Sequence, residues 1–236
     1  VTCEELSSEQ VSFPVIYHFS DLRANILNWY PIKKSDSVLE IGAGCGAITG
    51  TLCEKAGQVT SVELSKRRAQ INYYRNEKKD NLTIMVGNLN DMNLGQQYDY
   101  VVVNGVLEYA MSFTEGDTPY ETFLGKMGSY LKNTGKLLIA IENKLGMKYF
   151  AGAPEDHTDI PFFGINGYPE NHSVRTFSKT ELQELVKKSG FPFQKFYYPY
   201  PDYKFPTEIF TDASLTTNHY GKNYPIYTDK TVDLFS

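Results

Sequence analysis

The sequence has little of several features that mark particular classes of protein. Its 236 residues include only three cysteines, Cys3, Cys45 and Cys53, which are too few and too scattered for a disulfide framework or a metal site. We therefore predict no bound metal, and thiols that stay reduced in the cytoplasm. No apolar stretch approaches the roughly 20 residues that cross a bilayer, and no secretory signal is visible.

Positive charge is scarce as well. The chain has 23 Lys and Arg against 28 Asp and Glu, which gives a net charge of −5. Proteins that bind nucleic acid neutralise phosphates with basic patches, whereas the two short basic runs here, 66–68 and 78–79, have the pattern of solvated helix faces. The charge balance therefore argues against a nucleic acid as the main partner.

What the chain does have is a cluster of glycines. Residues 38–49 read as a buried strand that runs into three glycines on alternate positions, Gly42, Gly44 and Gly46, before a helical pattern begins. Glycine lets the backbone turn tightly and lets a ligand approach closely, because it has no Cβ. The amides at the start of the following helix then favour an anionic or polar group.

A second strand supports the same interpretation. Residues 58–63 end in Glu63, 17 residues after Gly46, where a ribose-binding acid falls in a mononucleotide-binding βαβ unit. The glycine spacing also satisfies the relaxed dinucleotide fingerprint, so NAD is an alternative. Glu40, inside the end of the first strand, favours S-adenosylmethionine (SAM), because a carboxylate there can face the cationic methionine portion of the cofactor or orient the loop that holds it.

Alternating strand and helix patterns follow along the chain. Beyond the two strands above, we predict strands at 81–86, 98–104, 136–141, 193–198 and 205–210. We predict helices at 21–30, 47–55, 65–79, 118–131 and 178–189, the last with a capping box from Ser178 to Glu181. The alternation predicts an α/β fold with a mostly parallel, doubly wound sheet and helices on both faces.

These residues carry a family resemblance. The order and spacing of Glu40-x-Gly-x-Gly-x-Gly46, Glu63, the strand 98–104 and the segment 131–141 resemble the class I SAM-dependent methyltransferases. The resemblance implies a Rossmann-like sheet of seven strands with an antiparallel hairpin at its C-terminal end. It also implies a methyltransferase that uses SAM and releases S-adenosylhomocysteine.

The resemblance assigns the cofactor contacts residue by residue. The three glycines carry the backbone around the methionine moiety, Glu40 anchors the loop, and Glu63 accepts both ribose hydroxyls, a bidentate contact that its lone pairs allow. Asn88 departs from the Asp that many members place at the adenine amino group, although its amide oxygen can still accept a hydrogen bond. Arg23 is the candidate partner of the cofactor carboxylate, with a plain surface arginine as the alternative. The other expected neighbours of the cofactor are Ala43, Leu64, Leu89, Asn104 and Gly105.

The acceptor side is expected in a segment of different character. Nine of the 18 tyrosines and eight of the 11 prolines lie between residues 149 and 227. The segment 143–177 is too long for an ordinary connection, and its aromatic content favours a functional loop over disorder. It begins at the carboxyl end of a central strand, where ligands bind in open α/β sheets.

Polar side chains in this segment supply the candidates for chemistry. The stretch 142–158 is so rich in polar groups that burying them without use would be costly. We take His157 or a neighbouring carboxylate, Asp156 or Glu142, as the candidate general base, which is needed only if the acceptor is a neutral hydroxyl or amine. For His157, a surface loop histidine is the alternative. The candidate acceptor-binding residues are Asn143, Lys144, Tyr168, Arg175, Tyr198 and Tyr203. Such a mixture of aromatic faces and polar groups suits sugars, and it suits a partner protein nearly as well.

Three stretches, 142–158, 175–179 and 197–206, resemble a narrower bacterial group of methyltransferases. Members of that group are encoded with, or fused to, glycosyltransferases of lipopolysaccharide and surface-polysaccharide synthesis. The resemblance implies methyl transfer to a hydroxyl of a sugar or glycan precursor in the cytoplasm, with such a glycosyltransferase as a partner. Two alternatives stay open: a methyltransferase for a small metabolite or a protein, and a SAM-binding module without turnover in a larger glycosyltransferase polypeptide.

We expect one domain over residues 1–236. Within it we predict an N-terminal helical or lid segment (1–35), a SAM-binding core (36–142), an acceptor-side insertion (143–177) and a C-terminal helix with a hairpin (178–236). Val1 is not an initiator methionine, and residues 231–236 stop inside an amphipathic pattern. We therefore expect the chain to be part of a longer polypeptide.

Overall fold

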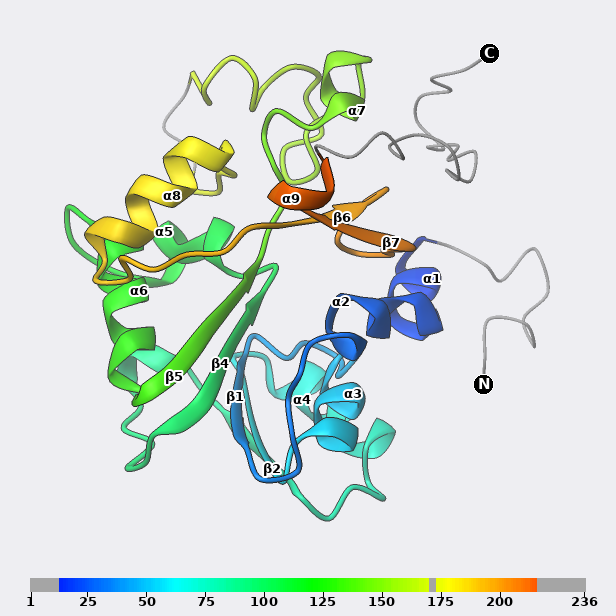
Figure 1. Ribbon diagram of the computed structural model, residues 1–236, viewed down its shortest axis with the longest axis vertical. Coiled ribbons are helices and arrows are strands. Elements are labelled where there is room, and N and C mark those ends of the chain that lie inside the picture. Colours follow the sequence, from blue (N-terminus) through cyan, green and yellow to red (C-terminus); the bar gives the residue numbers. More distant parts are fainter. Residues whose placement is uncertain (1–12, 170–172, 216–236) are drawn as a thin grey trace. The chain divides into compact units, whose positions relative to one another are not determined.

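The computed structural model describes residues 13–169 and 173–215 (Figure 1). Cys3 and the terminal parts of the predicted N-terminal and C-terminal segments lie outside the described residues. The chain groups into two compact units. The first, which we call the sheet unit, comprises Val1–Val106, Lys126–Ala140 and Pro199–Ile209; the second, the helix–loop unit, comprises Leu107–Gly125, Ile141–Tyr198 and Phe210–Ser236. The single domain expected from the sequence stays a prediction.

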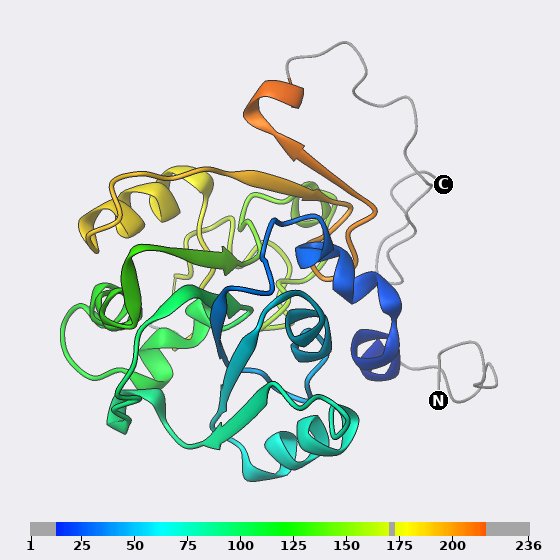
Figure 2. The same ribbon diagram turned by 60° about the horizontal axis from the view of Figure 1, so that its bottom comes forward.

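The sheet unit is built on a parallel sheet of five strands. They are β1 (Ser37–Ile41), β2 (Gln58–Glu63), β3 (Leu82–Val86), β4 (Tyr98–Asn104) and β5 (Leu131–Ala140), and they lie in the order β3-β2-β1-β4-β5. Figure 2 shows these strands side by side, with β1 in blue at the centre of the sheet and β5 in green at one edge. The order reverses between β1 and β4, and ligands of open α/β sheets bind beyond the carboxyl ends of the strands at such a switch point.

The central strands are buried on both faces of the sheet. Val38 and Leu39 of β1 point to opposite faces and are each 0% exposed, and Val101 and Val102 of β4 are 0% and 2% exposed. A strand covered on both faces reads as a continuous apolar run, which explains why the sequence predicted both strands. A core cluster consists of Leu27, Ile32, Val38, Ile48, Leu52, Cys53, Ala56, Val59, Tyr100 and Val102.

Short helices complete the sheet unit. They are α1 (Phe13–Phe19), η2 (Asp21–Ala24), α2 (Asn25–Asn28), α3 (Thr49–Lys55), α4 (Lys66–Arg75) and η3 (Leu89–Asp91). α3 packs against β2, and α4 packs against β2 and β3. The single helix predicted at 21–30 is divided into η2 and α2, and the cap of η2 is Ser20 rather than Asp21, because the Ser20 hydroxyl accepts from the amide of Leu22.

The helix–loop unit contains η4 (Leu107–Tyr109), α5 (Ala110–Phe113), α7 (Met147–Phe150), α8 (Lys179–Lys188) and α9 (Asp212–Leu215), while α6 (Pro119–Ser129) spans the boundary between the units. α8 begins at the predicted capping box. The Ser178 hydroxyl accepts from the amide of Glu181, and the Glu181 carboxylate accepts from the amide of Ser178, so this prediction is confirmed. The long segment before α8 is mostly irregular, as its length and composition predicted.

The prediction of a seven-stranded sheet is wrong. β6 (Tyr197–Tyr200) and β7 (Glu208–Thr211) form a separate antiparallel two-stranded sheet, and the described residues place five strands in the main one. Pro199 lies inside β6 and has no amide hydrogen to continue a ladder. A four-residue strand with this gap is a poor edge for a further parallel or antiparallel partner. The predicted hairpin is present, but it is not part of the main sheet.

Candidate cofactor and acceptor sites

The glycine loop, residues 42–46, turns at the carboxyl end of β1. The amides of Gly42 and Ala43 both donate to the carbonyl of Val62, at 2.9 and 3.2 Å, and so tie the loop to β2. Gly42, Gly44 and Gly46 have φ values of 67°, 56° and 78°. Residues with a Cβ rarely adopt this left-handed conformation, so the spacing of the glycines is a requirement of the turn itself.

The three glycines differ in what surrounds them. A Cβ on Gly46 would lie 2.2 Å from Oδ1 of Asn72, and a Cβ on Gly42 would lie 2.4 Å from Cγ2 of Val106. A Cβ on Gly44 would meet nothing within 4 Å. The loop is therefore packed against protein at its two ends and open at Gly44, where a ligand can approach the backbone.

Glu63 ends β2 beside the glycine loop and is 4% exposed. Its Oε2 accepts from the amide of Gly44 and its Oε1 from the amide of Ser65, both at 2.9 Å, and Nε of Arg68 lies 3.7 Å from Oε1. An ionised carboxylate has about four acceptor positions. Glu63 can therefore hold the loop and still accept from hydroxyl donors, and its ribose contact stays a prediction.

Glu40 lies beneath the loop, in β1, and is 5% exposed. Its Oε2 accepts from the hydroxyls of Thr49 and Ser61, at 2.7 and 2.6 Å. Burial raises the pKa of this carboxyl, although the two hydrogen bonds act in the opposite direction. Thr49 opens α3, and its hydroxyl also accepts from the side-chain Nδ2 of Asn72 in α4, at 3.1 Å. Through Thr49, Glu40 therefore fixes the helix that follows the loop.

Asn104 ends β4 next to the switch point. Ile41 and Val103 pair in register, so the glycine loop and Asn104 follow at neighbouring strand ends. The Oδ1 atom of Asn104 is buried and makes no hydrogen bond within the described residues. A buried amide oxygen without a donor fits a site at which a polar or cationic ligand group supplies one.

The other predicted cofactor neighbours have varied surroundings. Gly105 donates its amide to the carbonyl of Ala140 at 2.9 Å. The Asn88 side chain accepts from the amide of Asn90 at 3.0 Å and caps η3. Leu64 is 64% exposed and Leu89 is 6% exposed.

Arg23 is 2% exposed and is therefore not the surface arginine of the alternative interpretation. Its guanidinium donates to the carbonyl of Lys204 at 2.9 Å and to the hydroxyl of Tyr17 at 3.1 Å, and it lies 4.1 Å above the Tyr17 ring. Tyr203, predicted on the acceptor side, is 6% exposed and belongs to the same unit. Nζ of Lys204 lies 5.3 Å from the centre of the Tyr203 ring.

Two surface cavities of the sheet unit lie at the amino ends of the strands, at the other edge of the sheet from the glycine loop. One of about 410 Å³ is lined by Lys34, Gly57 and Asn81, which precede β1, β2 and β3. The other, of about 440 Å³, is lined by Gln97 and Tyr130, which precede β4 and β5. Both are at the amino ends of the strands, whereas the glycine loop, Glu63 and Asn104 are at the carboxyl ends.

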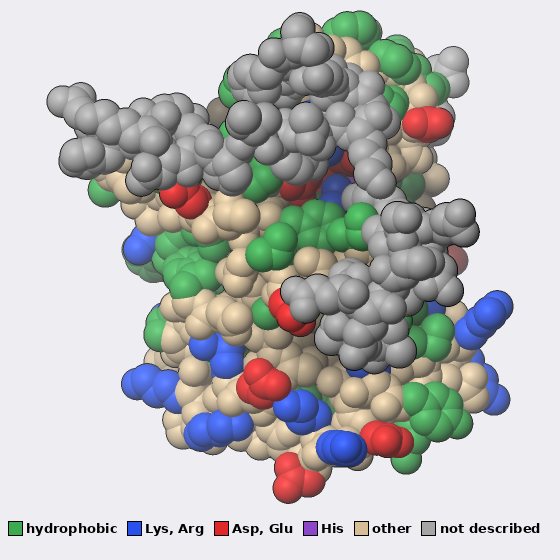
Figure 3. Space-filling model, turned by 90° about the vertical axis from the view of Figure 1, so that its right-hand side faces the viewer, with side chains coloured by type: hydrophobic (Ala, Val, Ile, Leu, Met, Phe, Trp, Pro, Cys, Tyr) green, Lys and Arg blue, Asp and Glu red, His purple; other side chains and the backbone are tan. Residues whose placement is uncertain are grey.

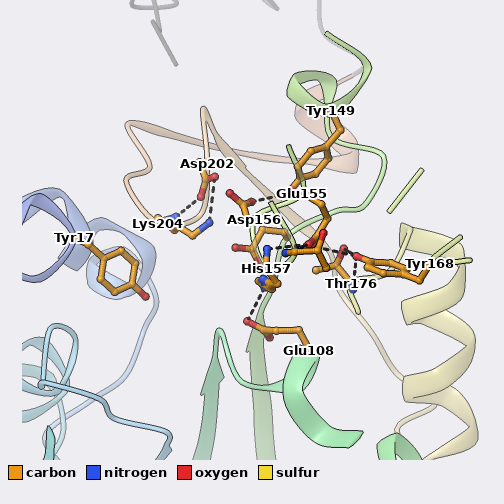
Figure 4. A network of polar contacts seen from close by, with 12 residues as sticks. Tyr17, Glu108, Tyr149, Glu155, Asp156, His157, Tyr168, Thr176, Asp202 and Lys204 are labelled. Atoms are coloured by element: carbon orange, nitrogen blue, oxygen red, sulfur yellow. Dashed lines mark hydrogen bonds and ion pairs between the residues drawn. The ribbon is translucent and has the colours of Figure 1, made fainter. Parts of the chain in front are cut away.

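In the helix–loop unit, His157 lies close to two buried carboxylates, that of Glu108, which Figure 4 labels, and that of Glu142. Its Nε2 is 3.8 Å from Oε1 of Glu108 and 3.9 Å from Oε2 of Glu142. Glu108 is 1% exposed, Glu142 is 5% exposed and the His157 side chain is 7% exposed. We call these three residues the His157 cluster. The imidazole also stacks on the ring of Tyr109, with centroids 5.2 Å apart and planes at 7°.

Glu155 holds the turn that carries His157. Its Oε2 accepts from the amides of His157 and Thr158, at 2.8 and 2.9 Å, and its Oε1 accepts from the hydroxyl of Tyr168 at 3.1 Å. The Tyr168 hydroxyl in turn accepts from the amide of Thr176 at 2.9 Å. Tyr168, a predicted acceptor contact, is thus a buried member of the network in Figure 4 that fixes the histidine backbone.

Asp156, the predicted carboxylate partner of His157, is engaged elsewhere. It accepts from Nζ of Lys148 at 2.7 Å and from the hydroxyl of Tyr149 at 2.6 Å. Burial and the neighbouring Asp156 carboxylate raise the pKa of Tyr149 far above its ordinary value, so this phenol stays protonated and donates. The carboxylates that flank the imidazole are Glu142, as predicted, and Glu108.

The remaining predicted acceptor residues pair with partners in the same unit. Lys144 donates to Glu181 at 2.6 Å, and Nη2 of Arg175 lies 3.7 Å from the same carboxylate oxygen. The Tyr198 hydroxyl donates to Asp212, and the exposed Asn143 accepts from the amide of Leu145 at 3.0 Å. These pairings order the surface of the unit, and an acceptor contact for each of them stays a prediction.

Glu108 and Tyr109 are candidate functional residues that the sequence analysis missed. Glu108 follows Asn104, the last residue of β4, by four positions, much as Glu142 follows Ala140, the last residue of β5, by two. Side chains just beyond the carboxyl ends of central strands are frequent ligand contacts in open α/β sheets. That position is the signal that identifies Glu108.

Comparison with known proteins finds a family model that matches part of the chain. Residues 39–137, which run from β1 into β5, match a family model described as a methyltransferase domain. This part of the chain is similar to known methyltransferase domains. This match covers the glycine loop, Glu63 and Asn104, and it contains no part of the segment 142–158.

Two curated relatives illustrate the similarity. The malonyl-[acyl-carrier protein] O-methyltransferase of Priestia megaterium is 26% identical over 163 residues, which is 68% of this chain and 48% of that protein. The ribosomal RNA small subunit methyltransferase A of Wigglesworthia glossinidia brevipalpis is 24% identical over 140 residues, which is 56% of this chain and 49% of that protein. The chain thus spans about half the length of these relatives.

Solved structures share the α/β methyltransferase fold. The YcgJ protein of Bacillus subtilis superposes with a TM-score of 0.53 at 17% identity, over 78% of this chain and 75% of that one. The phosphoethanolamine N-methyltransferase 1 of Haemonchus contortus gives a TM-score of 0.52 at 20% identity, over 69% of this chain and 32% of that one. The match of residues 39–137 supports the predicted enzyme class, a SAM-dependent methyltransferase, and the predicted cofactor. No helix among residues 13–169 and 173–215 is long and apolar enough to span a membrane.

Proposed function

We propose that the protein transfers the methyl group of SAM to a hydroxyl of a sugar or glycan precursor in the bacterial cytoplasm, during surface-polysaccharide synthesis of the lipopolysaccharide type. The observation that carries this proposal is the buried His157 cluster, because a hydroxyl acceptor needs a base and a methyl donor as reactive as SAM needs little else. A glycosyltransferase, fused or co-encoded, is the proposed partner.

The sheet unit supplies the residues for the cofactor. SAM brings an activated methyl group on a sulfonium sulfur, so the protein has mainly to hold and align it and to exclude water. The open backbone at Gly44 fits the methionine moiety, and Glu63 fits the ribose hydroxyls. The buried Oδ1 of Asn104 offers an acceptor at the next strand end.

The His157 cluster supplies the residues for the acceptor. Nε2 of His157 accepts the hydroxyl proton while the acceptor oxygen forms a bond to the methyl carbon and the carbon–sulfur bond breaks, with its electron pair left on sulfur. Glu108 and Glu142, at 3.8 and 3.9 Å, stabilise the imidazolium that forms. Glu155 and Tyr109 keep the ring in place.

A sugar acceptor is favoured by the character of the second half of the chain. Tyrosines and prolines are concentrated there, and the stretches 142–158, 175–179 and 197–206 resemble the methyltransferases associated with glycosyltransferases. On the face in Figure 3, Lys and Arg side chains are interspersed with Asp and Glu. On this face the mixture gives no basic patch of the kind that binds nucleic acid, on which the ribosomal RNA methyltransferase named above acts.

A transfer assay tests the proposal. The full-length protein is incubated with methyl-labelled SAM and a panel of nucleotide sugars and lipid-linked glycans, and the products are separated. Label on a glycan supports the proposal. Label on a small metabolite or a protein, added to the panel as further acceptors, supports the alternative of a methyltransferase for such an acceptor. Tight SAM binding without transfer to any acceptor contradicts an enzymatic role and favours a SAM-binding module.

A further inference from the structure

The His157 cluster has the composition of a metal site as well as that of a base. One oxygen of Glu108, one oxygen of Glu142 and one imidazole nitrogen of His157 all lie within 4.8 Å of one another. Metal–ligand bonds to such atoms are about 2.0–2.2 Å long, so two ligands of one ion lie at most about 4.4 Å apart. The imidazole–carboxylate separations of 3.8 and 3.9 Å already satisfy that limit.

We propose that Glu108, Glu142 and His157 bind a divalent transition-metal cation. Both nitrogens of the His157 ring are buried, and neither makes a hydrogen bond within the described part of the chain. The side chain is 93% shielded, and its Nε2 is directed at the two carboxylates. Leaving a buried imidazole without a hydrogen bond is costly, and a coordinated cation removes that cost for the nitrogen that binds it.

Charge favours the same occupant. Two glutamates with 1% and 5% exposure share one buried site, and like charges so placed repel each other. A divalent cation bound to both carboxylates would offset this repulsion. The donor set of two carboxylates and one imidazole suits Mn²⁺, Fe²⁺ or Zn²⁺ better than the all-oxygen sites that Mg²⁺ and Ca²⁺ prefer.

The residues around the three ligands hold them in place. Glu155 fixes the backbone of His157 through two amide hydrogen bonds, and the parallel Tyr109 ring fixes the plane of the imidazole. The amide of Arg175 donates to the carbonyl of Glu108 at 3.1 Å. Supporting contacts of this kind orient metal ligands in proteins and contribute to affinity.

Three protein ligands leave coordination positions open, as in catalytic metal sites. The acceptor hydroxyl can occupy one of them, lose its proton to solvent and attack the methyl carbon as a metal-bound alkoxide, while the carbon–sulfur electron pair stays on sulfur. His157 is then a ligand rather than a base. This step rests on the proposed function, whereas the binding of the cation does not.

Titration of Mn²⁺ into the metal-stripped, full-length protein tests the site, with the free ion measured by electron paramagnetic resonance and Zn²⁺ as a competitor. We expect one saturable Mn²⁺ site per chain that Zn²⁺ displaces. Glu108→Gln and Glu142→Gln remove one ligand each and should weaken Mn²⁺ binding by roughly 100-fold or more, since loss of even a supporting contact costs 10–100-fold. Glu115→Gln, the same change on an exposed loop of the unit, should bind like wild type.

Thermal unfolding gives a second readout, because a ligand that binds only the folded state raises the unfolding temperature. Mn²⁺ should raise it in wild type and in Glu115→Gln, and leave it unchanged in Glu142→Gln. If wild type shows no saturable Mn²⁺ binding, the proposed site is overturned whether or not any variant folds. The site is also overturned if both Gln variants bind Mn²⁺ with the affinity of wild type.

The assay separates this inference from the proposed function. Mn²⁺ binding without methyl transfer to any acceptor contradicts the proposed function and supports the metal site. Methyl transfer that chelators leave at its full rate, in a protein shown to bind Mn²⁺, overturns the role of the ion in acceptor activation and returns His157 to the role of base.

Discussion

The glycine loop and the His157 cluster are built in different ways. The loop is made by residues 42–46, which are contiguous, and its shape is set by backbone conformation, with positive φ at three glycines. The cluster is made by residues 108, 142 and 157, which are far apart in the chain, and it depends on side chains that meet only after folding. One site is encoded by local sequence and the other by tertiary structure.

Because of this difference, the two sites should respond differently to substitution. A contiguous loop fails when one residue cannot adopt the required backbone, so substitutions there affect stability and cofactor binding together. An assembled cluster fails when one functional group is removed, and its polar members contribute little to the hydrophobic core. Substitutions in the cluster should therefore reduce chemistry and leave SAM binding intact.

The largest effect is expected from His157→Ala. Loss of this side chain should slow methyl transfer roughly 10²–10⁴-fold, whether the imidazole acts as a base or holds an ion. Initial rates with labelled SAM and the acceptor found in the panel measure the effect. Equal rates in wild type and variant would show that His157 takes no part in the chemistry and would contradict the role given to the His157 cluster.

Substitutions of glycine test how far the glycine loop depends on its backbone conformation. Gly46→Ala adds left-handed strain of roughly 1–2 kcal/mol and drives a Cβ into the buried side chain of Asn72, with a further loss of roughly 1–3 kcal/mol in hydrogen bonds. Gly95 has a similar φ of 65° and open space around it, so Gly95→Ala should show the strain alone. Urea unfolding of both variants measures the difference, and equal losses would mean that Asn72 moves aside without cost.

The smallest effect is a pH dependence that comes from Glu40. Burial raises the pKa of this carboxyl above 4.5 in the folded protein, so the folded state binds the proton more tightly than the unfolded chain does. The bound proton therefore adds to the free energy of unfolding at acid pH, and this contribution is lost as the pH rises through the pKa that Glu40 has in the folded protein. The free energy of unfolding of wild type, relative to Glu40→Gln, should therefore fall as the pH is raised from about 4. A rise over that range would contradict the expected sign.

The sequence predicted the sheet unit well, for physical reasons that act locally. β1 and β4 are continuous apolar runs because both faces are covered, and the glycines mark a turn that other residues cannot make. The capping box at Ser178 is equally local. The assignment of the hairpin to the main sheet failed because the choice of partner between strands is a tertiary property. Pro199 argues against pairing with the main sheet only once the position of β6 is known.

The acceptor side could be predicted only in part. Glu142 and His157 stand out in a polar stretch, but nothing local connects them to Glu108 or to the Tyr109 ring. Asp156 was favoured because it adjoins His157, yet it accepts hydrogen bonds from Lys148 and Tyr149. Likewise, nothing in the sequence indicates that Arg23 is buried against the Tyr17 ring.

The most direct test of the two-site description is a calorimetric titration of SAM into wild type, Glu63→Ala and His157→Ala. Loss of the charge-assisted hydrogen bonds of Glu63, worth about 1.5–3 kcal/mol, should weaken SAM binding by roughly tenfold or more. His157→Ala should bind SAM like wild type. Unchanged affinity in Glu63→Ala, or a matching loss in His157→Ala, would contradict the assignment of the cofactor to the glycine loop and of the chemistry to the cluster.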